Sequence, residues 1–329
     1  MPGARFTGRA HTNGMSRQEP LPTSLTSAPF TVSAARELGY GRGKLRSTQL
    51  ARPFHGVRAP VNTGLFELCR AYATRMHPAH AFSHTTAAAL WGMPLPRSLD
   101  KSIIHVSAPA PLRAPEGRRV SGHRLSGLVA VERWGIRVTP PALSWMHLSE
   151  TLAVHDLVAA ADFAITGSPF DNVLPIATLD ELAAAHVSGA SRGRRARAVA
   201  LPLVQEGALS RPESLVRVLL VQAGIPSPRV NPSIVDARGS FVAMPDLAWP
   251  EFRFAIEYEG DHHRGVRQFR RDIRRIEALV DLRWSVMKVS ADDLFDRPDE
   301  LVARVLRRLT SHGWTPPRIE LRHTAHFER

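Results

Sequence analysis

The stretch MPDLAWPEFRFAIEYEGDHH, residues 244–263, is the most informative part of the C-terminal third of this chain. Residues two apart on a β-strand point to the same side of the sheet and lie roughly 6.5–7 Å apart. Glu257 and Glu259 therefore share one side of the strand that we predict over 252–259. The opposite side is apolar or aromatic and faces a core, and it consists of Phe252, Phe254, Ile256 and Tyr258.

The acidic residues of this stretch predict a site for a divalent metal ion. Two carboxylates on an apolar strand repel each other and lose hydration, unless a cation or a partner base offsets that cost. Asp246 precedes Glu257 by the length of one neighbouring strand and a turn. Three carboxylates, Asp246, Glu257 and Glu259, are thus expected to converge.

The residues that follow predict a helix over 264–281 with two different faces. Apolar residues recur at helical spacing and form a buried stripe. Six arginines occupy the rest of the surface, and two acidic residues can pair with only some of them. We interpret this arginine face as a contact for the phosphate backbone of DNA, and a solvated helix face is the alternative. The six are Arg264, Arg267, Arg270, Arg271, Arg274 and Arg275.

The C-terminal region predicts a mixed sheet flanked by helices, within an α/β (α+β) chain. We place Asp246 at the end of one central strand, and Glu257 and Glu259 at the end of the next. The expected order is helix (212–223), strands (about 229–236, 240–248 and 252–259), helix (264–281), strand (283–289) and helix (298–310).

This order resembles the PD-(D/E)xK nuclease superfamily, whose domains have a restriction-endonuclease-like fold. The segments PESLVRVLL, MPDLAWPEFRFAIEYEGDHHR and QFRRDIRRIEALVDLRWSVMKVSADDL are similar to very-short-patch-repair-like endonuclease domains of actinobacterial proteins. The resemblance covers about residues 210–310. We therefore expect a nuclease-like domain over 208–311 and a C-terminal extension over 312–329.

The resemblance implies roles for individual residues. Asp246 and Glu257 would be ligands of Mg²⁺ or Mn²⁺, and Glu213 would hold a water molecule bound to the metal. His263 resembles a histidine that repair-type members place near the phosphate, where it can act as general acid or base. Its alternative role is to orient a loop.

The chain departs from the superfamily pattern at one position. A lysine is usual two residues after the second acidic residue, and Glu259 stands there instead. Many members of the repair-like branch also carry an acidic residue at this position. Lys288, on the next predicted strand, is a candidate source of the missing positive charge, and the alternative is an ordinary lysine at a strand end.

The N-terminal part predicts a disordered tail over 1–28 and a basic, winged-helix-like head over 29–60. Thr31 or Ser33 is suited to cap a first helix, and a second is expected near 44–50. The outline of helix, turn, helix and wing would direct Arg42, Lys44 and Arg46 toward DNA. The alternative is a basic arm that packs on the next domain.

An α/β middle domain is expected over 61–200. Its segments SHTTAAALWG and TPPALSW…DLVAAADFAI resemble the AbiEi-like antitoxin regions that are often fused to such nuclease domains. Ser83 is predicted to cap a short helix there. Three scattered histidines could bind a metal, but structural roles are commoner, and we assign no function to His84, His105 and His123.

Composition narrows the functional classes. The formal net charge is +13, and three lysines among 43 basic residues leave 40 arginines. This excess favours a phosphate partner such as DNA, although a GC-rich genome also raises arginine content. Cys69 is the single cysteine, which excludes an intrachain disulfide and fits the cytoplasm. No apolar stretch is long enough for a membrane span.

These observations predict a metal-dependent endodeoxyribonuclease that acts in repair, restriction or phage defence. The alternative is a non-catalytic DNA-binding regulator of AbiEi antitoxin type with a degenerate nuclease fold. A small-molecule metalloenzyme would explain the carboxylates but leaves the arginine helix unexplained.

Overall fold

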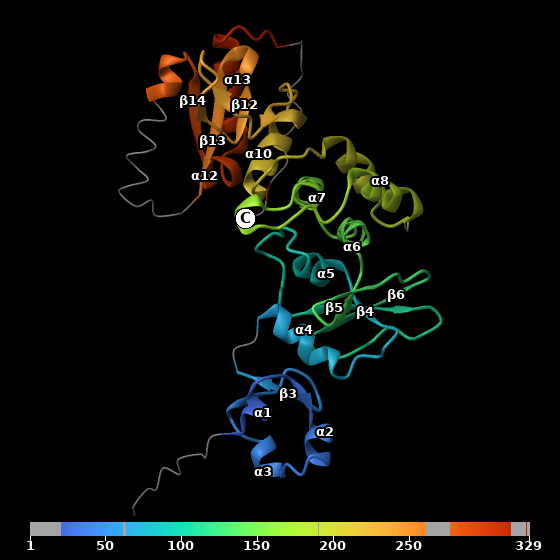
Figure 1. The fold of residues 1–329 in the computed structure, drawn as a ribbon. Coiled ribbons are helices and arrows are strands. Elements are labelled where there is room, and N and C mark those ends of the chain that lie inside the picture. The colour runs from blue at the N-terminus through green and yellow to red at the C-terminus, as the bar shows by residue number, and fades with distance from the viewer. Residues whose placement is uncertain (1–20, 62–63, 190, 261–276, 317–326, 328–329) are drawn as a thin grey trace, which may run out of the picture. The chain divides into compact units, whose positions relative to one another are not determined.

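A computed structural model of the 329-residue chain describes residues 21–61, 64–189, 191–260, 277–316 and 327. The chain forms two compact units, Met1–Met76 and His77–Arg329. Colour follows the chain in Figure 1, with the first unit in blue. Among the described helices, none is both long and apolar enough to cross a lipid bilayer.

The first unit combines short helices with a small antiparallel sheet. Its elements follow in the order helix, strand, two helices, two strands and a final helix. Thr31 caps the second helix, since its Oγ1 accepts a hydrogen bond from Ala34 N at 3.2 Å. The sheet order is β1-β3-β2. The elements are α1 (Thr23–Thr26), β1 (Phe30–Thr31), α2 (Val32–Glu37), α3 (Arg42–Leu45), β2 (Leu50–Ala51), β3 (Val57–Pro60) and α4 (Leu65–Ala73).

Two features of the first unit differ from our expectations. Residues 21–28, which we expected to be disordered, contain α1, because Leu25 packs into a small apolar cluster with Ala35 and Leu45. Helix α4, which we assigned to the middle domain, belongs to the first unit. The rings of Tyr72 on α4 and Phe54 lie 5.0 Å apart.

The middle region of the second unit is a five-stranded mixed sheet with five α-helices. Strands β5 and β6 are parallel, as are β4 and β8, and the sheet order is β6-β5-β4-β8-β7. The strands are β4 (Ala81–Phe82), β5 (Ile104–Pro109), β6 (Val120–Leu125), β7 (Val131–Arg133) and β8 (Ile136–Val138). The helices are α5 (His84–Leu90), α6 (Pro141–Leu148), α7 (Val154–Thr166), α8 (Leu179–Ser188) and α9 (Arg194–Ala200), with 3-10 turns η1 (Pro169–Asp171) and η2 (Leu201–Leu203).

The C-terminal region contains the predicted mixed sheet, with strand order β14-β13-β12-β9. Strands β13 and β14 are parallel and the other pairs are antiparallel. Helices α10 and α13 lie beside this sheet in Figure 1. The elements are α10 (Arg211–Gln222), β9 (Arg229–Val230), β10 (Ile234–Val235), β11 (Phe241–Ala243), β12 (Leu247–Trp249), η3 (Pro250–Phe252), β13 (Phe254–Glu259), β14 (Ser285–Ser290), α12 (Ala291–Phe295) and α13 (Pro298–Ser311).

The core face of this sheet follows the alternation read from the sequence. Phe254 and Ile256 are buried with Leu247 and Trp249 in one apolar cluster, to which α10 and α13 contribute leucines and valines. Phe252 packs against the same cluster, but it lies in η3 and not in the strand. The strand expected over 240–248 is divided into β11 and β12. Only residues 277–281 of the expected helix 264–281 are described, and these are helical.

Helix α10 connects the middle region to the C-terminal region. Its Val218 packs into the middle core, and its Leu215 packs into the core of the β14-β13-β12-β9 sheet. On the same helix, Arg217 Nη2 lies 2.6 Å from Asp162 Oδ2 on α7. Ser214 Oγ donates to that oxygen at 2.7 Å. A buried ion pair thus fixes the start of the C-terminal region on α7.

Candidate functional site

The candidate carboxylates lie where β13 ends and β12 begins. Glu257 and Glu259 are on the face of β13 opposite Phe254 and Ile256, as the two-residue period predicts. The Glu257 side chain is buried, with a residue exposure of 5%, whereas Glu259 is partly exposed. The two acids therefore share a face but differ in their contact with water.

Asp246 immediately precedes β12 and does not end a strand, contrary to our expectation. Asp246 still lies near the acidic residues of β13, because β12 is antiparallel to β13. Leu247 pairs with Ile256, so Asp246 follows directly on the ladder at the level where Glu257 follows Ile256. Asp246 Oδ2 also accepts a hydrogen bond from Tyr258 N at 2.6 Å.

The carboxylate of Glu213 is hydrogen-bonded to protein groups close to these strands. It is buried in the first turn of α10, and its Oε2 accepts hydrogen bonds from Leu209 N at 2.9 Å and from Asn231 Nδ2 at 2.8 Å. Asn231 N in turn donates to Asp246 O at 2.9 Å. Glu213 is therefore joined to the start of β12 through Asn231, a residue that the sequence analysis did not identify.

Lys288 lies on β14 at the level of the carboxylates. The parallel register pairs Lys288 with Glu257, and Lys288 Nζ lies 2.5 Å from Glu259 Oε1. The two side chains of this ion pair are 45% and 37% exposed, so its contribution to stability is small. A cation from the neighbouring strand thus stands beside the glutamate that replaces the usual lysine.

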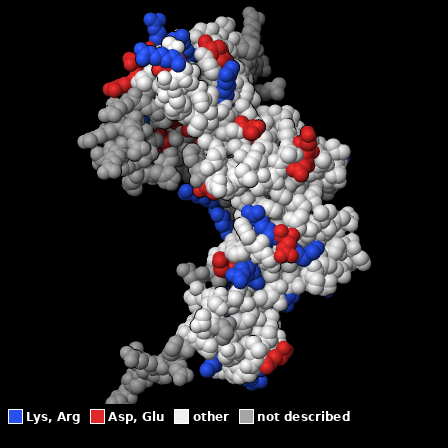
Figure 2. Space-filling model, viewed as in Figure 1, with Lys and Arg blue, Asp and Glu red and all other residues white. Residues whose placement is uncertain are grey.

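The basic residues fall into two groups. Arg42, Lys44 and Arg46 are exposed along and just after α3, while Leu45 between them is buried. Figure 2 shows that the visible face is mostly uncharged, with small groups of basic side chains and acidic ones nearby. The predicted DNA contacts of the following helix lie outside the described residues, and so does His263. These contacts are Arg264, Arg267, Arg270, Arg271, Arg274 and Arg275.

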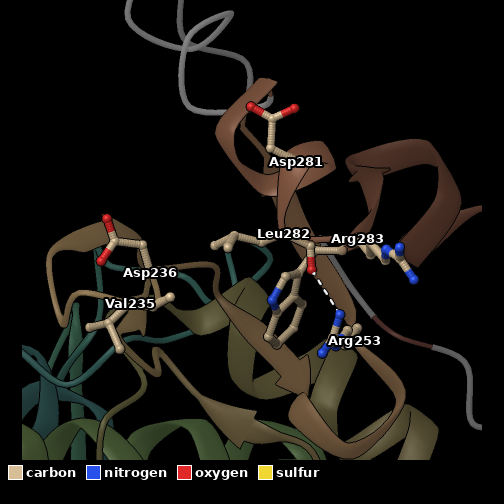
Figure 3. A pocket seen from close by; sticks show the side chains of 8 residues that line it. Val235, Asp236, Arg253, Asp281, Leu282 and Arg283 are labelled. Atoms are coloured by element: carbon tan, nitrogen blue, oxygen red, sulfur yellow. Dashed lines mark hydrogen bonds between the residues drawn. The ribbon is translucent and has the colours of Figure 1, made fainter.

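A pocket of about 390 Å³ lies elsewhere in the C-terminal region (Figure 3). Its lining includes Trp284 and Arg253, and Arg253 Nη1 donates to Leu282 O at 3.2 Å. Arg253 precedes β13, whereas Glu259 ends it, so the two are separated by roughly 20 Å of extended chain. The pocket is therefore distinct from the carboxylates.

Another set of possible metal ligands lies in the middle region. Within the described part of the chain, His84, His105 and His123 are the one group of three or more whose ligand atoms all lie within 4.8 Å of one another. No three of the described acidic residues meet the same distance limit. Single histidines at distant positions gave no spacing signal in the sequence.

Comparisons with known proteins give relatives without a described function. No family model matches the chain. The uncharacterized proteins MT2308 and Rv2248 of Mycobacterium tuberculosis are each 34% identical to it over 122 residues. The match covers 36% of this chain and 45% of each relative, so the chain spans less than half the length of these curated relatives.

One solved structure is similar over part of the chain. The crystal structure of RV2827C protein from Mycobacterium tuberculosis aligns with a TM-score of 0.38 and 15% sequence identity. The alignment covers 57% of this chain and 75% of that chain.

Proposed function

We propose that the chain is a metal-dependent DNA endonuclease that hydrolyses phosphodiester bonds, with Asp246 and Glu257 as ligands of Mg²⁺ or Mn²⁺. One observation carries this proposal. The pairing of Leu247 with Ile256 brings Asp246 to the end of β13, where Asp246 Oδ2 accepts a hydrogen bond from Tyr258 N, and Lys288 of β14 pairs with Glu257. In this proposal the sheet β14-β13-β12-β9 with α10 and α13 is a restriction-endonuclease-like domain.

The donor atoms suit a hard cation. Mg²⁺ takes oxygen ligands and is commonly bound through one or two carboxylates, with waters and phosphate oxygens completing its shell. A carboxylate has about four lone-pair sites, and Asp246 Oδ2 accepts one hydrogen bond from Tyr258 N. When bound, the cation would supply Lewis-acid activation of water and of the phosphate.

The other residues of the site have positioning and electrostatic roles in this proposal. Lys288 would stabilise negative charge on the scissile phosphate, since its ammonium group is beside Glu259. Glu213 would hold the start of β12 in place through Asn231, because its Oε2 is engaged by two protein donors. Glu213 is then a positioning residue and not a metal ligand.

Cleavage of DNA by the full chain tests the proposal. Purified protein is incubated with supercoiled, linear, mismatched and single-stranded DNA in Mg²⁺, in Mn²⁺ and in EDTA. We expect metal-dependent nicking that Asp246→Asn and Glu257→Gln abolish. Asp281→Asn and Glu251→Gln are matched controls, because both residues are exposed and lie outside the carboxylate cluster. No cleavage of any substrate, or full nicking by Asp246→Asn, would refute the enzyme.

The first unit supports a second candidate, a DNA-binding regulator of antitoxin type. Arg42, Lys44 and Arg46 are exposed on and just after α3, where a winged-helix-like head would present them to DNA. Such a regulator would bind duplex DNA tightly in EDTA without cleaving it, and its affinity would fall steeply with salt. The affinity of such a regulator falls with salt, so the slope of log affinity against log salt is negative. Replacing all three cations with glutamine should reduce the magnitude of that slope by about 3.

A further inference from the structure

Four histidines of the middle region lie in one cluster, built around the parallel pair β5 and β6. His105 is on β5 and His123 is on β6, and the register pairs His105 with Ser121 and Ser107 with His123. Residues two apart share a face, so both histidines are on the same side of the sheet. His84 begins α5, which packs on β5, and His147 comes from α6.

The imidazole rings of this histidine cluster are in direct contact. His84 is stacked on His123 with centroids 3.6 Å apart, and on His147 with centroids 4.4 Å apart. His105 Nδ1 lies 2.9 Å from His123 Nε2. The ligand nitrogens of His84, His105 and His123 are all within 4.8 Å of one another.

Burial and the neighbouring positive or imidazole groups favour neutral rings. Burial, followed by the neighbouring imidazoles, lowers the pKa of His84 to about 2, and burial and His123 lower the pKa of His105 to about 4. Burial and then Arg192 lower the pKa of His123. The neutral imidazole is the form that binds metal ions.

Hydrogen bonding in the cluster is incomplete. His147 is 3% exposed, and its Nδ1 has no hydrogen-bond partner within the described part of the chain. A histidine cluster that served packing alone would be expected to satisfy its buried nitrogens. Ser83 precedes α5, as predicted for a capping residue, but its side chain makes no capping hydrogen bond. Its Oγ lies 2.9 Å from His84 Nδ1 and accepts a hydrogen bond from Ser107 at 2.7 Å.

We propose that His84, His105 and His123 bind a divalent transition-metal ion of the zinc class. Imidazole nitrogens select zinc and its neighbours over magnesium. With Nδ1 engaged by Ser83, His84 offers Nε2 to the metal, and the serine hydroxyl has the role of an outer partner that orients the ring. His105 and His123 are half-buried, which gives the ion a route from solvent and leaves a fourth position for water or a small ligand.

Binding requires a small closure of the rings. Tetrahedral zinc with Zn–N bonds of about 2.0–2.1 Å places its ligand nitrogens roughly 3.3 Å apart. The nitrogens of the three histidines lie within 4.8 Å of one another, and their rings are stacked. Binding therefore requires shifts of about 1 Å together with ring rotations that turn the in-plane lone pairs toward one point. The proposal is independent of the nuclease proposal, since it uses other residues and another class of metal.

Zinc retention by the full chain tests the proposal. Protein stripped with EDTA is loaded with Zn²⁺, passed through gel filtration and assayed for metal, and its affinity is measured by competition with a chromophoric chelator. Loading with Co²⁺ gives a second readout, because histidine coordination of low coordination number produces visible absorption. We expect one tightly held ion per chain, and at least a 10-fold to 100-fold loss of affinity in His105→Ala and His123→Ala.

The controls separate this site from surface histidines and from misfolding. His77 and His80 form another close pair, with ring centroids 5.0 Å apart, and the variant His77→Ala/His80→Ala should keep full zinc affinity. His123→Gln preserves side-chain bulk and a polar group, and circular dichroism with thermal melting establishes that each variant is folded. Wild-type protein that loses zinc on gel filtration, or a folded His105→Ala/His123→Gln variant with unchanged affinity, would overturn the proposal.

Discussion

The carboxylate site and the histidine cluster are two sets of possible metal ligands on two different sheets of the second unit. The first offers oxygen atoms, and Asp246 and Glu213 accept hydrogen bonds from the protein there. The second offers neutral nitrogen atoms, of which His147 Nδ1 lacks a partner within the described part of the chain. Hard oxygen donors suit Mg²⁺ or Mn²⁺, and imidazoles suit zinc. In the two proposals, donor chemistry therefore gives the two sheets different ions.

The largest expected effect is a separation of the two metal functions. Asp246→Asn should lower Mg²⁺-dependent cleavage at least about 100-fold and leave zinc retention unchanged. His123→Ala should do the opposite. Cleavage rates and zinc content measured on the same protein batches check this. If one variant lost both properties while folded, the two sites would be a single functional unit and the comparison would be wrong.

The buried ion pair that joins the two regions should have the next largest effect. Burial raises the pKa of Asp162, and Arg217 opposes that shift. Asp162→Ala leaves Arg217 charged and buried, so it should lower the free energy of unfolding by about 3–5 kcal/mol in urea titrations. The double variant Asp162→Leu/Arg217→Met should recover much of this loss.

The exposed pair Arg113–Glu116 is the matched control for the buried pair. Its side chains are 85% and 73% exposed, and Arg113→Ala should change the free energy of unfolding by less than about 1 kcal/mol. Equal losses at Asp162 and Arg113 would mean that the regions of the second unit are not joined through α7 and α10.

Acid should destabilise the histidine cluster in metal-free protein. Burial and neighbouring imidazoles hold the pKa of His84 at about 2, and burial, His123 and Arg197 hold the pKa of His147 at about 4. Unfolded histidine has a pKa of about 6.5. Below that pH the unfolded chain binds protons that the folded chain does not, so stability falls as the pH drops from about 6.5 toward 4.

Urea titrations in EDTA at several pH values measure this dependence. His147→Phe removes one titrating group and should flatten the profile between about pH 6.5 and 4. His186→Phe, at another histidine of the second unit, is the control. A profile identical in wild-type protein and in His147→Phe would show that His147 is protonated normally in the folded state.

Lys288 should have the smallest effect on stability. Its partly exposed ion pair with Glu259 is worth less than about 1 kcal/mol, so Lys288→Gln should unfold at nearly the wild-type urea concentration. Its cleavage rate should fall about 10-fold or more, because the ammonium group would no longer stabilise phosphate charge. Lys101→Gln, at a lysine of the middle region, should change neither property.

The short-range patterns of the sequence predicted much of the structure. The alternation in 252–259 separated Glu257 and Glu259 from the core face, because a strand has a fixed two-residue period. The cap at Thr31 was also correct. Helix α1 was not predicted, because its segment is mostly polar. It packs through Leu25 in a small apolar cluster.

Long-range relations were harder to predict. Asn231 and Asp246 meet through the pairing of separate strands, so no local pattern gave their hydrogen bond. The histidine cluster depends on the register between β5 and β6, and a shift of one residue would turn His123 to the other face. The histidines are visible in the sequence, but their proximity depends on the strand register.

Helix α10 has a consequence for how this protein can be divided. Helix α10 contributes Val218 to one core and Leu215 to the other, so a fragment that begins at residue 208 would expose apolar surface. Arg217 would also lose the carboxylate that neutralises its charge. The C-terminal region is therefore not a portable module. Transplanting it onto another protein would require carrying α7, with Asp162, along with it.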